Sequence, residues 1–191
     1  MSQSFAPPRG DPRVPFAIIL TVYAVLGLTV LRFNRNLWQM LLTVGTACLL
    51  DSAFAWVLRR QALVPLSAYI SGVSLALLVN YAHDYWLLLI PVYLTIASKY
   101  LLTYDGKHVF NPSMFGLAVS LLVSRDLIST APAYQWGGNL AMTLFLVTTA
   151  LSLFVFRIGR TPLIASFLAL YLLQILLRAW YLRWFIPVET L

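Results

Sequence analysis

Seven apolar segments, separated by short polar stretches, make up most of this 191-residue chain. A helix needs roughly 20 apolar residues to cross a bilayer, and most of the segments approach that length. Lipid cannot satisfy open backbone polar groups, and the segments lack the alternating polarity of barrel strands, so they are predicted to be helices. They cover approximately residues 14–31, 37–58, 62–80, 86–102, 109–124, 139–156 and 161–177.

The composition predicts an all-α integral membrane protein with about six or seven transmembrane helices. Hydrophobic residues make up 61% of the chain and charged residues only 10%, which leaves too little polar surface to cover a soluble globule. The net charge of +7 does not indicate nucleic-acid binding. The arginines occur in pairs between the apolar segments, as at helix ends in contact with lipid headgroups. Membrane lipids are therefore the expected surroundings.

The ends of the chain are predicted to be tails around one helical domain. Residues 1–13 are polar and proline-rich, which favours a flexible tail over a signal peptide. Residues 14–186 are predicted to form a single transmembrane domain, followed by a short tail at 187–191. If all seven segments cross, loop cations favour a cytoplasmic N-terminus. The two sides would hold Arg9, Arg13, Arg59, Arg60, Lys99, Lys107, Arg157 and Arg160 against Arg32, Arg35, Arg125, Arg178 and Arg183.

Asp51 is a carboxylate in the middle of the second apolar segment, where an unpaired charge would be costly. It is predicted to have a partner or to be protonated. One interpretation is a proton or cation relay, or a contact to a polar cofactor. The other is a structural hydrogen bond to a neighbouring helix terminus or arginine. The single Cys48 lies in the same segment and cannot form an internal disulfide.

A polar loop between the fourth and fifth segments is the candidate binding site. It holds Lys99 and Lys107, the only lysines of the chain, together with His108 and Asn111. Pro112 suits the first turn of a helix with Asn111 near its cap, and a helix N-terminus beside cations favours an anion such as a flavin phosphate. The alternative is an ordinary interfacial loop between two tilted helices. Both flanking segments are short or interrupted, as broken helices around a membrane site are.

Small residues in the third segment predict close helix packing. Ser71, Gly72 and Ser74 would let a neighbouring helix approach its backbone. The sequence contains no cysteine or histidine cluster of the kind that binds a metal, and no nucleophile–base pair stands out, so no independent catalytic residue is predicted.

Several of these motifs occur in an order that resembles the RnfD/NqrB family. These proteins are membrane subunits of the Rnf electron-transport complex and of the sodium-translocating NADH:quinone reductase. The matching strings are LWQ at 37–39, LLD at 49–51, SGVSLALL at 71–78 and FNPSM at 110–114. RnfD-like proteins of enediyne biosynthesis clusters look most similar, around GKHVFNPS at 106–113 and APAYQWGG at 131–138.

The resemblance implies the first repeat of a urea-transporter-like fold with interrupted half-helices, in a bacterial inner membrane. It also implies FMN attached to a threonine in a Ser/Thr-Gly-Ala-Thr-like motif. The stretch after the fifth segment has no such motif, and Thr130 is only a remote candidate. The family would continue into a second repeat where this sequence stops.

Three functions remain open from the sequence. The first is an accessory or structural subunit of a larger redox or bioenergetic complex, without covalent FMN and bound to other integral membrane subunits. The second is an electron-transfer subunit that holds a flavin or a quinone non-covalently near Lys99, Lys107, His108 and Asn111. The third is an oligomeric transporter or channel.

Overall fold

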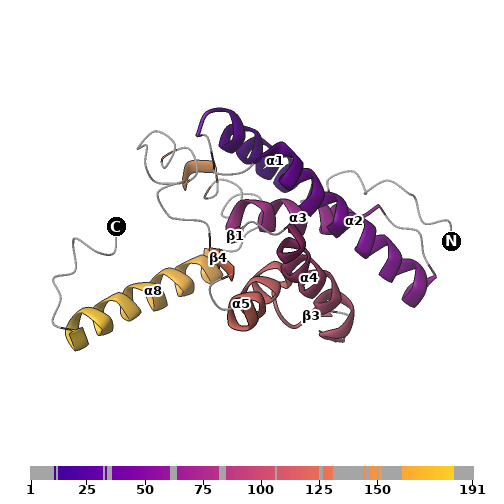
Figure 1. The fold of residues 1–191 in the computed structure, drawn as a ribbon. Coiled ribbons are helices and arrows are strands. Elements are labelled where there is room, and N and C mark those ends of the chain that lie inside the picture. Colours follow the sequence, from indigo (N-terminus) through magenta and orange to yellow (C-terminus); the bar gives the residue numbers. More distant parts are fainter. Residues whose placement is uncertain are drawn as a thin grey trace. The chain divides into compact units, whose positions relative to one another are not determined.

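The chain is mostly helical in the computed structural model (Figure 1). It divides into two compact units, Met1–Thr143 and Leu144–Leu191. The structure describes residues 11, 13–31, 33, 36–60, 64–81, 85–105, 107–124, 127–130, 144, 147–149, 151 and 161–182. Apart from residues 11 and 13, the predicted tails lie outside this part, as does most of the sixth predicted helix. The single domain over residues 14–186 stays a prediction.

Helix α1, Arg13–Thr29, begins at a local ion pair. The Asp11 carboxylate accepts a hydrogen bond from the Arg13 backbone N–H at 2.9 Å and contacts the guanidinium at 2.6 Å. A carboxylate at this position also interacts favourably with the positive end of the helix dipole. The hydrogen bonds from Arg13 lower the pKa of the Asp11 carboxyl, so this helix start stays ionised at lower pH than an isolated aspartate would.

Helix α2, Leu37–Arg59, is bounded by specific caps. Asn36 and Gln39 form a reciprocal capping box: the Asn36 side chain accepts from the Gln39 N–H at 2.8 Å, and Gln39 accepts from the Asn36 N–H at 3.1 Å. At the other end Arg60 adopts a left-handed conformation with φ of 52°, which closes the last turn. The predicted segment 37–58 matches this helix within one residue.

Three shorter helices follow, each of 13 residues. They are α3 at Leu66–Leu78, α4 at Leu89–Leu101 and α5 at Pro112–Ser124, and a single-turn 3-10 helix, η1 at Tyr85–Leu88, leads into α4. At 1.5 Å per residue each α-helix is about 20 Å long, which is less than the roughly 30 Å of a hydrocarbon core. The shortness predicted for the fourth and fifth segments is confirmed, and the third helix is shorter than predicted.

Two short strand pairs accompany the helices of this mostly helical fold. Strand β1, Val79–Tyr81, continues directly from α3 and pairs antiparallel with β4, Ile128–Thr130, which follows α5. Strands β2, Thr103–Tyr104, and β3, Lys107–His108, form a hairpin between α4 and α5. Strands of two or three residues are too short to show alternating polarity, so the sequence did not predict them.

The core of the first unit lies where these elements meet (Figure 1). Helices α3, α4 and α5 pack together, and α2 packs on both α3 and α4. The paired strands take part in this core, since Val79 and Ile128 are each 1% exposed. One cluster of buried apolar residues forms the centre of this core and consists of Ala47, Ala68, Leu75, Val79, Leu87, Val92, Ile96, Leu117 and Ile128.

Two glycines set the closest helix contacts. A Cβ on Gly72 of α3 would lie 3.0 Å from the Val44 Cα and 3.1 Å from the Ala47 Cβ on α2. A Cβ on Gly116 of α5 would lie only 2.7 Å from the Pro91 carbonyl oxygen of α4. The α4–α5 contact therefore depends on glycine, whereas the α2–α3 contact would have to widen slightly for a larger residue.

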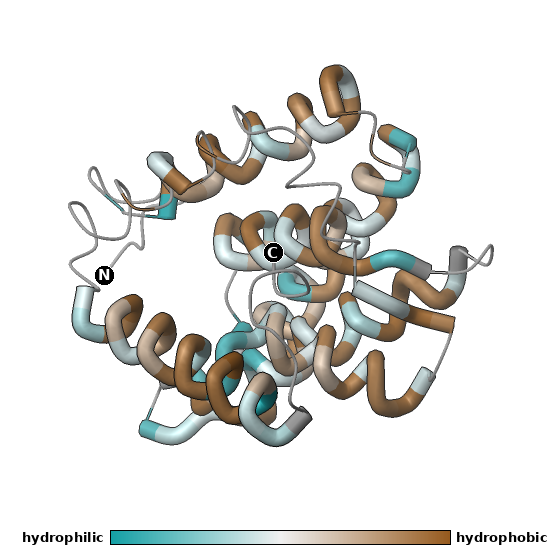
Figure 2. Tube along the Cα trace, turned by 90° about the vertical axis from the view of Figure 1, so that its left-hand side faces the viewer, coloured by the Kyte–Doolittle hydropathy of each residue, from teal (hydrophilic) through white to brown (hydrophobic). Residues whose placement is uncertain are grey.

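Two described helices are long and apolar enough to cross a membrane. One is α2, and the other is α8, Thr161–Leu182, in the second unit. No residue in the most apolar 18-residue stretch of α8 is buried. Apolar residues predominate along the described helices, and hydrophilic residues occupy short stretches (Figure 2).

We expect Gly116→Ala to lower the free energy of unfolding by about 1–3 kcal/mol, because the added methyl group meets backbone atoms of α4 that cannot rotate away. Unfolding of the purified protein by SDS in mixed micelles, followed by circular dichroism, measures the effect. Gly45→Ala on α2 is the matched control, because nothing lies within 4 Å of its added Cβ. Equal stability changes for the two variants would contradict the close α4–α5 contact.

Candidate functional site: a buried ion pair between helices

The central polar feature of the first unit is an ion pair that joins α2 to α4. The Lys99 ammonium lies 3.3 Å from the Asp51 Oδ1. The side chains are 5% and 14% exposed, respectively, so both charges are largely removed from solvent. Asp51 therefore has the partner that its apolar surroundings require, and the partner is a lysine rather than an arginine or a helix terminus.

Tyr100, the residue after Lys99, reinforces the same contact. Its hydroxyl donates to the Asp51 carbonyl oxygen at 3.0 Å and lies 3.1 Å from the Asp51 Oδ1. The Tyr100 ring stacks on Phe54, with centroids 5.3 Å apart and planes at 19°. Because Phe54 lies on α2 almost one turn after Asp51, the polar and aromatic contacts hold the same two helical turns together.

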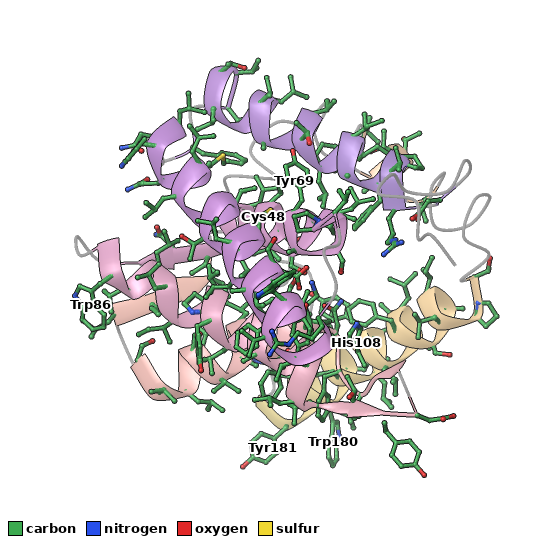
Figure 3. The ribbon with its side chains drawn as sticks, turned by 90° about the vertical axis from the view of Figure 1, so that its right-hand side faces the viewer. Cys48, Tyr69, Trp86, His108, Trp180 and Tyr181 are labelled. Carbon is green, nitrogen blue, oxygen red and sulfur yellow. The ribbon has the colours of Figure 1, made fainter. Side chains whose placement is uncertain are left out.

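The arrangement acts as a clamp more readily than as a conducting path. Lys99 donates to the Asp51 Oδ1, and the single Tyr100 hydroxyl hydrogen is shared between this oxygen and the Asp51 carbonyl oxygen. The donors therefore converge on Asp51 instead of forming a chain of successive donors and acceptors. A buried ion pair neutralises each member, and removing either one leaves an uncompensated charge in apolar surroundings. Cys48 lies one turn before Asp51 with a free, partly buried thiol (Figure 3).

The other predicted binding residues lie in the hairpin and at the start of α5. Lys107 and His108 form β3, and the turn before them has Asp105 at a φ of 50°. Helix α5 begins at Pro112, as predicted, and the Asn111 Oδ1 accepts from the Ser113 N–H at 3.2 Å. His108 is exposed (Figure 3), and the described positions do not include the Lys107 side chain.

The four residues predicted to form a binding site therefore fall into two groups in the structure. The Lys99 ammonium is engaged by Asp51, whereas Lys107, His108 and Asn111 belong to the segment that leads into α5. Asn111 already uses its side-chain oxygen as a cap. Within the described part of the chain, no group of three or more metal-ligating side chains is present.

The remaining candidates lie in packed or paired positions. Thr130 ends β4 opposite Val79, and its side chain is exposed. Ser71 and Gly72 are buried on α3, with Gly72 against α2, and Ser74 is partly buried.

Sequence reasoning missed the pairing of Asp51 with Lys99 and the part played by Tyr100. A signal was available: each segment that forms α2 or α4 contains one charge within its apolar stretch, and the two charges have opposite sign. Opposite charges inside apolar helices are expected to find each other. The pairing of two helices is not readable from periodicity, which gives the face of a helix but not its neighbour.

Comparison of the chain with protein-family models, with curated proteins and with solved structures finds no match in any of the three. The likeness to the RnfD/NqrB family therefore rests on the sequence strings alone.

We expect either Asp51→Leu or Lys99→Met to lower the free energy of unfolding by about 3–5 kcal/mol, because each leaves the other charge buried without a partner. The double variant should lose less than either single variant, since it removes both charges. SDS unfolding of all four proteins in mixed micelles gives the coupling energy.

Asp11→Asn serves as the control for removing a carboxylate. Its partner Arg13 has a side chain that is 55% exposed, so solvent screens the charge that remains and the loss should be smaller. Additive losses in the Asp51/Lys99 double variant would show that the two side chains do not depend on each other.

Proposed function

We propose that the chain is an accessory or structural membrane subunit of a larger redox or bioenergetic complex, of the RnfD/NqrB type and without covalently bound FMN. One observation carries the structural part of this proposal: the helices expose large apolar faces while the central charges are paired inside. Such a body is suited to lipid and to neighbouring membrane subunits. The assignment to a redox assembly comes from the sequence resemblance.

Helix lengths and surfaces support a place in the membrane. Helices α2 and α8 have the length and composition of spanning helices. The shorter α3, α4 and α5 fit the role of interrupted half-helices within the six or seven membrane segments that we propose. Non-helical backbone at membrane depth requires burial within the protein. Val79 in β1 and Ile128 in β4 are each 1% exposed and are buried in this way, whereas Ser129 and Thr130 are exposed.

Apolar surface available to a partner supports the subunit role. An open apolar groove of about 520 Å³ runs along α4 and α5 between Trp86 and Val123. On α8, the Leu163, Phe167 and Trp180 side chains are 65–80% exposed. Apolar surface of this extent is covered by lipid or by a partner protein when a membrane helix is in its native surroundings. We place the complex in a bacterial inner membrane with the N-terminus on the cytoplasmic side.

The proposal predicts that gentle detergent extraction of the tagged chain from its native membrane yields a stable complex with other integral membrane proteins. Mass spectrometry identifies the partners, and an absorbance spectrum of the separated subunit tests for a cofactor. We expect redox proteins among the partners and no flavin absorbance in this subunit.

Two other results would contradict the proposed structural role and would favour one of the two other functions that the sequence leaves open. A flavin spectrum or an extracted quinone that stays with the separated chain would favour an electron-transfer subunit. A homo-oligomer without other proteins would contradict the accessory role and favour a transporter or channel.

A further inference from the structure

A cavity of about 160 Å³ lies between α1, α2 and α3, away from the Asp51–Lys99 pair. Apolar side chains such as Met40, Val44 and Val73 line it, and among the described residues its only polar lining residues are Thr21 and Tyr69. An apolar cavity of about 150 Å³ in another protein stays dry and binds benzene, so this volume admits a ring or a short alkyl chain.

The two hydroxyl groups in the wall form a hydrogen bond with a definite direction. The Thr21 Oγ1 donates its hydrogen to the Ala17 carbonyl oxygen at 2.7 Å, and the Tyr69 hydroxyl oxygen lies 2.6 Å from the same Oγ1. Because a hydroxyl group has one hydrogen, the Tyr69 hydroxyl must be the donor to Thr21. Figure 3 shows Tyr69 on α3, in the region between α3 and α1.

This direction decides which chemical group the cavity can recognise. Both hydroxyl hydrogens are used within the protein, so the part of the wall that the structure describes has no side-chain hydrogen left to donate. Among the described residues Thr21 is the only hydrogen-bond partner of the Tyr69 oxygen, which therefore keeps an acceptor position. A water molecule is poorly held here, because it needs two to four polar partners.

We propose that the cavity binds an apolar alcohol from the lipid phase, with the ligand hydroxyl donating to the Tyr69 oxygen. The ring or chain of the ligand replaces empty space among apolar side chains. Val25, Leu37 and Leu41 line the cavity and are also exposed, so a molecule can enter from the apolar surroundings of the helices. The binding site rests on the proposed location in the membrane, but it is independent of the proposed redox assembly because it uses only α1, α2 and α3.

Two fluorinated probes of similar shape test the hydroxyl preference. ¹⁹F NMR on the full chain in lipid nanodiscs measures the binding of 4-fluorophenol and of 4-fluorotoluene, each corrected for partition into empty nanodiscs. We expect saturable binding of the phenol that is about two- to tenfold tighter than binding of the toluene, the usual effect of one net hydrogen bond. Equal binding of the two probes, or no saturable binding of the phenol, would overturn the proposal.

Variants separate hydrogen bonding from a general loss of structure. Tyr69→Phe should bring the phenol-to-toluene ratio to about one while toluene still binds, and Tyr104→Phe, at an exposed tyrosine outside the cavity, should leave the ratio unchanged. Val73→Phe should fill the cavity and reduce binding of both probes. Retention of the phenol preference in Tyr69→Phe would show that the alcohol binds elsewhere.

Thr21→Val gives the most specific test of the direction of the hydrogen bond. This substitution frees the Tyr69 hydrogen, so the variant should gain affinity for 4-fluoroanisole, whose ether oxygen only accepts hydrogen bonds. The wild-type chain should bind 4-fluoroanisole no better than 4-fluorotoluene. Preferential binding of the anisole by the wild-type chain would contradict the assigned direction.

Discussion

The packing of the first unit depends on the pairing of Asp51 with Lys99. These residues are 48 positions apart in the sequence, and neither charge can remain alone in apolar surroundings. Their contact fixes which turn of α4 faces α2. The chain between them, which forms α3, β1 and η1, must therefore fold in a way that keeps α2 and α4 in contact.

The glycine contacts and the short strands complete this arrangement. Gly72 brings α3 against α2, and Gly116 brings α5 against α4. The β1–β4 pair then joins the chain just after α3 to the chain just after α5. Helices of only 13 residues have little stability of their own, because helix formation needs a costly nucleus. Contacts on several sides, from helices and from strands, allow such short helices to persist.

Within the described part of the chain, the sequence predicted where helices form better than it predicted which helices pack together. Apolar length located α2, and Asn111 before Pro112 located the start of α5, because those signals are local. The β1–β4 pair joins residues about 50 positions apart, and no local pattern encodes it. The Lys99 position was predicted as a ligand-binding residue because its nearest polar neighbours in sequence are in the loop, whereas its actual neighbour comes from another helix.

The ion pair also bears on the choice between a scaffold and a cofactor-binding subunit. Lys99 cannot neutralise Asp51 and a cofactor phosphate at once without leaving one negative charge only partly compensated, and an uncompensated buried charge costs several kcal/mol. An anion near α5 would therefore rely on Lys107, His108 and the first turn of the helix. The Asn111 oxygen already occupies that first turn by accepting from the Ser113 N–H. These two contacts favour a structural subunit over a cofactor-binding one, because the Lys99 ammonium and the first turn of α5 already take part in contacts that stabilise the fold.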